Sequence, residues 1–226
     1  AVVLWLRSKK LTDDETVFPT GMSEALRGLS LLYIIFAWII AALAVLGGIL
    51  TIAETSLDNL RSMYVIIAAL AMLSGLSFPL ICSASRSHYS PSLVSVFMAL
   101  PILMYCVWLI ASYRANANNP NVWMFAIEII AVCCAILALF YVAGYAFGRP
   151  DPKKACYMSL LGAFMCITTL ADSRYMGLEL IILATAGMLL MYSWLIIKNR
   201  CAKDELPPEP EKAAQPEPEE PDGHRH

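Results

Sequence analysis

The chain has 226 residues, of which 59% are hydrophobic and 15% are charged, and its formal net charge is −2. A typical soluble domain is about half apolar and a quarter charged, so this composition argues against one. It also excludes a strongly basic protein, and nothing in the sequence supports binding to nucleic acid.

Residues 1–28 precede the first long apolar run, and we expect them to form a cytoplasmic or interfacial segment. The first ten residues pass from apolar to basic, which is how a membrane span ends on the cytoplasmic side. Two interpretations stay open. These residues are the end of a truncated helix, or the initiator Met was removed before Ala1 and Trp5 rests at the membrane interface.

Six apolar runs follow, at residues 29–52, 63–83, 92–113, 122–147, 155–171 and 175–197. About 20 residues of helix cross the hydrocarbon core of a bilayer, and the fifth run, with 17 residues, is the shortest. Lipid offers the backbone no hydrogen bonds, so a span is a helix or part of a closed barrel, and the runs lack the alternation of a barrel. Residues 29–197 are therefore predicted to form an all-α polytopic membrane helix bundle with six transmembrane helices.

The distribution of lysine and arginine predicts the orientation of this bundle. Short loops on the cytoplasmic side of a membrane carry an excess of these residues. Alternate connections place eleven of them on one side and three on the other, namely Arg61, Arg114 and Arg174. We therefore expect a multi-pass protein of the cell membrane, with both ends of the six-span unit in the cytoplasm.

Small residues recur along the first run at steps of four, three and four: Ala37, Ala41, Ala44 and Gly48. In a membrane, such a ridge lets two helix backbones approach closely. It predicts packing of the first helix against another helix, either within this chain or in a partner.

Two prolines, Pro79 and Pro101, lie inside the second and third runs. Proline removes one hydrogen bond of a helix and bends it. We expect a kink at each, which is either the ordinary shape of a membrane helix or a bend that lines a substrate path.

The acidic residues within the runs are Glu128 and Glu179, in the fourth and sixth runs, at similar depths from the external side. An ionisable side chain inside a membrane is costly, so it usually faces the bundle interior or a partner. Asp172 and Arg174 lie in the hairpin just above. These four residues form our candidate ligand or ion site. The alternative is that the glutamates only reach interfacial water or pair with Arg174 or Arg114.

No sequence pattern indicates a catalytic or metal site. The seven cysteines have no CxxC spacing and the three histidines lie outside the runs, so zinc lacks four convergent ligands. An HExxH motif and a P-loop are both absent. We therefore expect no catalytic residue, no metal and no cofactor. A weaker alternative is a membrane enzyme that uses the two glutamates as acid and base.

Residues 198–226 follow the last run, and positions 204–222 contain eight acidic residues, one lysine and six prolines. Such a segment cannot bury enough apolar surface to fold. We expect a disordered, acidic and Pro-rich cytoplasmic tail. It acts either as a solvated spacer or as a docking segment for a basic partner.

We expect a non-enzymatic binding or interaction module that contacts the lipid bilayer, and either a membrane-protein partner or a small solute. The alternative is a small-solute transporter, or its substrate-binding subunit, with a carboxylate-containing site near the external face. The layout of six spans and a small-residue ridge resembles the substrate-capture subunits of energy-coupling factor vitamin transporters. That resemblance is in layout only, without a matching motif, and a layout does not determine function.

Overall fold

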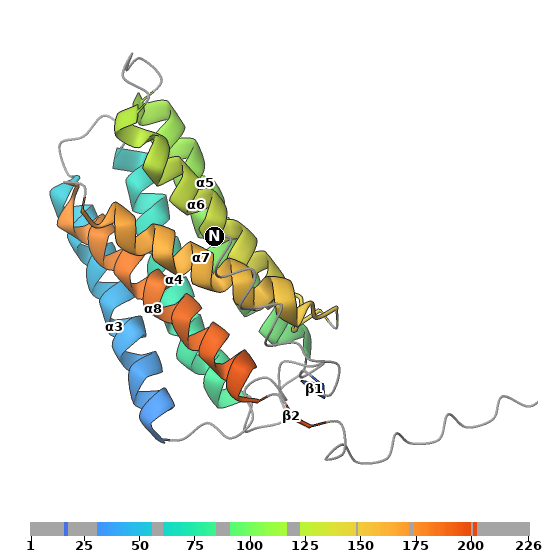
Figure 1. The fold of residues 1–226 in the computed structure, drawn as a ribbon. Helices are drawn as coiled ribbons and strands as arrows, with labels where there is room; N and C mark the ends of the chain where they lie inside the picture. Colours follow the sequence, from blue (N-terminus) through green and yellow to red (C-terminus); the bar gives the residue numbers. More distant parts are fainter. Residues whose placement is uncertain are drawn as a thin grey trace, which may run out of the picture.

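A computed structural model describes the chain at residues 16–17, 31–55, 61–84, 91–116, 123–147, 149–171, 174–199 and 201–202. These residues form six helices and one pair of two-residue strands (Figure 1). The helices are α3 (Leu31–Glu54), α4 (Arg61–Ala84), α5 (Pro91–Asn116), α6 (Trp123–Ala143), α7 (Pro152–Thr169) and α8 (Met176–Lys198). The strands are β1 (Thr16–Val17) and β2 (Cys201–Ala202), which pair antiparallel.

The six helices form a closed ring in which each helix packs against the next in sequence and α8 packs back against α3. Helix α8 also contacts α4 and α6, and it is the most buried of the apolar helices. Large side chains fill the space between the helices, among them Phe78, Tyr105, Trp108, Leu139 and Leu189. The predicted all-helical bundle is confirmed.

Apolar side chains cover the outside of the ring as well as its core. Large exposed residues occur on every helix, such as Trp38, Leu73, Val96, Phe140 and Phe164. Water would penalise such a surface, whereas the hydrocarbon of a bilayer would not. The arrangement therefore indicates a membrane-embedded protein.

Among the described helices, α3, α4, α5, α6 and α8 are long and apolar enough to cross a membrane. Helix α7, which corresponds to the predicted fifth span, is not in this set. It has 18 residues, and its first turn contains Pro152, Lys153 and Lys154, which leaves a shorter apolar stretch. Length and composition thus support five of the six predicted spans.

The fourth helix is shorter than predicted, because it ends at Ala143 and the chain turns over Gly144–Phe147 instead of continuing as helix. The Arg149 N–H donates to the Gly144 carbonyl at 2.9 Å. A Cβ on Gly144 would lie 2.8 Å from the Arg149 carbonyl oxygen, so only glycine fits this reversal. Helix α7 then begins with Asp151 as its N-cap, whose carboxylate accepts a hydrogen bond from the Lys154 N–H.

The predicted small-residue ridge is buried: Ala37, Ala41, Ala44 and Gly48. A Cβ on Gly48 would lie 2.9 Å from the Ala68 carbonyl oxygen of α4, and one on Gly75 would lie 2.6 Å from the Ala44 side chain. The ridge therefore faces α4 within this chain. Beside it, Gly47 approaches Gly177, so that α3 also lies close to α8.

Pro79 and Pro101 lie inside helices α4 and α5, and neither proline ends its helix. The predicted segments 1–28 and 198–226 fall almost wholly outside the described residues. The expected tail at 204–222 lies outside them entirely.

Candidate functional site

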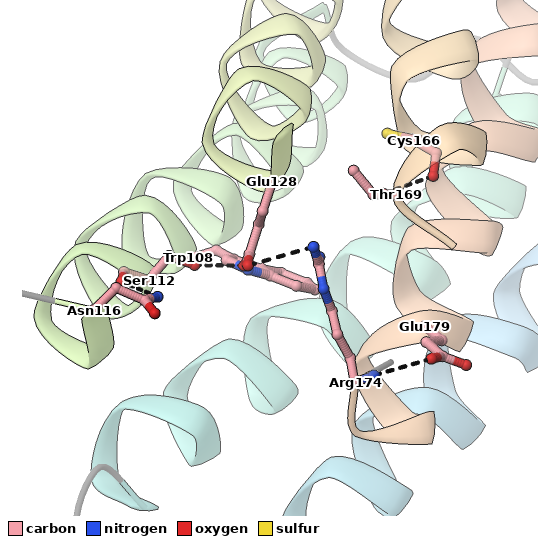
Figure 2. Close-up of polar contacts among 8 residues, drawn as sticks. All are labelled: Trp108, Ser112, Asn116, Glu128, Cys166, Thr169, Arg174 and Glu179. Carbon is pink, nitrogen blue, oxygen red and sulfur yellow. Dashed lines mark hydrogen bonds and ion pairs between the residues drawn. The ribbon is translucent and has the colours of Figure 1, made fainter. Parts of the chain in front are cut away.

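Glu128 lies in the second turn of α6, and its carboxylate faces α5 across the helix contact (Figure 2). Its Oε1 accepts a hydrogen bond from the indole N–H of Trp108 at 2.7 Å and another from the Ser112 hydroxyl at 2.5 Å. Trp108 and Ser112 are four residues apart on α5, so they share one face of that helix. Ala131 and Ala135, which follow Glu128 along α6, are buried.

The second oxygen of Glu128 faces a cation. Nη2 of Arg174, in the connection between α7 and α8, lies 3.6 Å from Glu128 Oε2. The Arg174 and Glu128 side chains are only 10% and 15% exposed. Both charges are thus largely withdrawn from solvent. A buried charge requires a partner of opposite sign, and each of the two provides one for the other.

Glu179 supports the main chain that carries Arg174. Its Oε1 accepts a hydrogen bond from the Arg174 backbone N–H at 3.3 Å. Glu54, at the end of α3, accepts from the Gly177 N–H at 3.0 Å. The N-cap residue Tyr175 makes no side-chain cap bond. Glu54 therefore provides an acceptor for the first turn of α8, whereas Glu179 bonds the residue just before the N-cap. Glu179 and Glu128 lie on different sides of Arg174 in Figure 2.

A cavity of about 440 Å³ opens beside the Glu128–Arg174 pair. Its polar lining comes from these two residues together with Ser112 and Asn116 of α5. Three aromatic side chains line it as well: Tyr64 of α4, Trp108 of α5 and Tyr175 just before α8. The Tyr64 and Tyr175 rings meet edge to face with centroids 6.0 Å apart. We call this the polar cavity.

The structure brings together two of the four predicted site residues. Glu128 and Arg174 pair directly, which is the geometry of the alternative interpretation, and both also line the polar cavity. Glu179 does not line it and instead bonds the backbone of Arg174. Asp172 lies outside the described residues.

Sequence reasoning missed Trp108 and Ser112, the two donors to Glu128. The sequence feature that could have identified them is a tryptophan and a serine one helical turn apart near the external end of the third run. They point to Glu128 only once α5 and α6 are known to be neighbours. Glu54 was also missed, because its partner Gly177 is 123 residues away in sequence.

The described residues contain no group of three or more His, Cys, Asp or Glu side chains that could hold a metal ion. The six cysteines within the helices are free thiols. The polar cavity contains one carboxylate and one guanidinium, which already pair with each other. This arrangement is suited to holding a solute by hydrogen bonds and charge.

Fold and site together define a membrane-embedded helical bundle with a polar cavity at one end. No protein-family model, curated protein or solved structure matches this chain.

Proposed function

We propose that the protein is a non-enzymatic, multi-pass membrane protein that binds a small solute in the polar cavity. The observation that carries this proposal is the placement of Glu128 and Arg174. Two largely buried opposite charges line a cavity of about 440 Å³ beside three aromatic side chains. Cavities that bind small molecules commonly measure about 300–1,000 Å³ and combine apolar walls with a few convergent polar groups.

The lining indicates the chemistry of the solute. Within the described part of the chain, Glu128 Oε2 contacts only Arg174, at 3.6 Å, which leaves this oxygen able to accept a hydrogen bond from a donor group on a solute as well. Tyr64, Trp108 and Tyr175 line the cavity, and aromatic rings attract a cationic nitrogen that lies over a ring face. We therefore favour a small solute that carries an amine and an apolar portion.

We further propose that α7 is the sixth membrane span and that the cavity opens to the cell exterior. Arg149, Lys153, Lys154 and Lys198 all belong to the end of the bundle opposite the cavity. This excess of basic residues is typical of a cytoplasmic side. Cysteine-accessibility labelling tests the orientation: a cysteine at Lys153 should react only from the cytoplasmic side.

Thermal unfolding of the full chain in detergent, with a panel of small amines added one at a time, tests the binding proposal. At least one amine should raise Tm for the wild type, and Glu128→Gln should abolish the rise. Arg114→Gln is the matched control, because Arg114 is exposed on α5 at the same end of the bundle. A panel without effect on the wild type, or a rise that survives in Glu128→Gln, contradicts the proposal.

Uptake into proteoliposomes separates binding from transport. A binding module should retain the stabilising amine without accumulating it inside the vesicles. Accumulation that Glu128→Gln abolishes would instead make the polar cavity part of a transport path.

A further inference from the structure

A second cavity, of about 470 Å³, lies on the outer face of the ring between α3 and α7, with α8 as its floor. Tyr33, Phe36 and Ile40 line one side, Leu160 of α7 lines the other, and Gly187 and Trp194 lie on α8 between them. The side chains of Phe36 and Trp194 are 58% and 59% exposed, so the cavity opens toward the surrounding lipid. We call it the lateral groove.

Gly187 deepens this groove, although packing between helices does not require a glycine there. Among the described residues, a Cβ placed on Gly187 would meet only the flexible Ile40 side chain, at 3.4 and 3.5 Å, which is ordinary contact. By contrast, a Cβ on Gly47 would lie 2.8 Å from the Gly177 carbonyl oxygen, where α3 and α8 need glycine to approach. The missing side chain at 187 therefore creates open space on the lipid-facing surface.

One end of the lateral groove is polar and cationic. The Trp194 indole N–H donates to the Tyr33 hydroxyl at 2.5 Å, and Lys198 Nζ lies 4.9 Å from the centroid of the Tyr33 ring. Tyr33 is in the first turn of α3 and Lys198 is the last residue of α8, so this end faces the membrane boundary. Tryptophan, tyrosine and lysine are the residues that favour the depth of the lipid headgroups.

We propose that the lateral groove binds one acyl chain of an anionic phospholipid, whose phosphate contacts Lys198. The apolar trough runs inward from Tyr33 past Phe36 to Ile40, and a chain held there has its headgroup beside the cation. Basic sites on the cytoplasmic side of membrane helices attract anionic headgroups. A helix of another protein fits less well, because bulky Phe36 and Trp194 form the rim, whereas helix contacts in membranes favour small residues.

Native mass spectrometry of the full chain, released from micelles containing equal amounts of phosphatidylglycerol and phosphatidylcholine, tests this site. The one-lipid complex of the wild type should favour phosphatidylglycerol about fivefold, the effect of one lysine near an anionic lipid. Lys198→Gln should remove this preference. Lys153→Gln, a matched exposed lysine at the same end of the bundle, should keep it.

A second pair of variants tests the groove itself. Gly187→Leu fills the trough and should reduce the one-lipid complex several-fold, whereas Gly187→Ala should leave most of it. Equal binding of the two lipids by the wild type, or an unchanged preference in Lys198→Gln, overturns the proposal. So does a dimer that Gly187→Leu dissociates, because the groove would then hold a second copy of the chain. If Gly187→Leu does not fold, the lysine pair decides the result alone.

Discussion

Arg174, in the connection between α7 and α8, pairs with Glu128 on α6 at 3.6 Å. This contact links the α7–α8 connection to α6. The carboxylate is also held by Trp108 and Ser112 of α5. Helix α5 and the α7–α8 connection thus both contact the Glu128 carboxylate of α6.

Breaking this pair should destabilise the bundle, because the remaining charge stays largely buried. Glu128→Gln or Arg174→Gln should each lower the free energy of unfolding by roughly 3 kcal/mol, the low end for loss of one partner of a buried pair. The double variant should lose less than the sum of the two single variants. Unfolding by SDS titration in mixed micelles measures all three. Strictly additive losses would show that the two side chains do not interact.

Trp108→Phe should lower the free energy of unfolding by at least about 1.5–3 kcal/mol, because a hydrogen bond to a charged group is lost and the smaller phenyl ring also leaves a gap at this buried position. Trp38→Phe serves as the control, since Trp38 lies on the lipid-facing side of α3 and is 56% exposed. The same SDS titration compares the two. If the two variants lose equal stability, the bond from Trp108 to Glu128 contributes nothing.

Gly177→Ala should destabilise the contact of α8 with α3 by about 1–3 kcal/mol, the usual result of overpacking. A Cβ at this position would overlap the Thr51 backbone nitrogen and lie 2.7 Å from the Gly47 carbonyl oxygen. Gly187→Ala, on the same helix, should instead gain roughly 0.5–1 kcal/mol, because alanine favours a helix and its Cβ has room. A Tm for Gly177→Ala at or above that of Gly187→Ala would be incompatible with this packing.

The Asp151 cap of α7 should contribute stability that depends on pH. Burial raises the pKa of Asp151, but hydrogen bonds and the charge of Lys154 lower it by more, so that the net pKa lies below the ordinary value of 3.8. A lowered pKa means that the charged form is favoured in the folded state. The contribution is therefore full above the ordinary pKa and is lost as the pH falls through the lowered one.

Asp151→Ala should accordingly cost about 1 kcal/mol at neutral pH, and the difference from wild type should shrink in acid. Asp151→Asn keeps a capping side chain but cannot titrate, so it should lie closer to wild type at neutral pH. Free energies of unfolding measured along a pH series test both variants. A cost for Asp151→Ala that stays constant into strong acid would rule out the charged cap.

The helices were predictable because apolar runs in this chain are long and separated by short polar connections. Their bounds differ from prediction where local chemistry decides, as at Gly144, where a tight reversal ends α6 before the apolar stretch does. Local composition also decides whether α7 is long and apolar enough to cross a membrane. Its first turn contains Pro152, Lys153 and Lys154, so the apolar part of the helix is short.

The site was predictable only in part. Glu128 stood out because a carboxylate in an apolar helix needs a partner, and Arg174 was among the partners considered. Which helices touch is set by packing across the whole ring, so the donors Trp108 and Ser112 could not be assigned. The hydrogen bond from the Gly177 N–H to Glu54 could not be predicted either, because it depends on the packing of α8 against α3.

The return of α8 to α3 makes the order of the helices cyclic in space, although the chain is linear. Helix α3 begins and α8 ends at the same end of the bundle (Figure 1). A circular permutant that joins these two points and is cut between α4 and α5 would retain every neighbouring pair of helices. The same ring of helix contacts can therefore form from a chain that begins at a different helix.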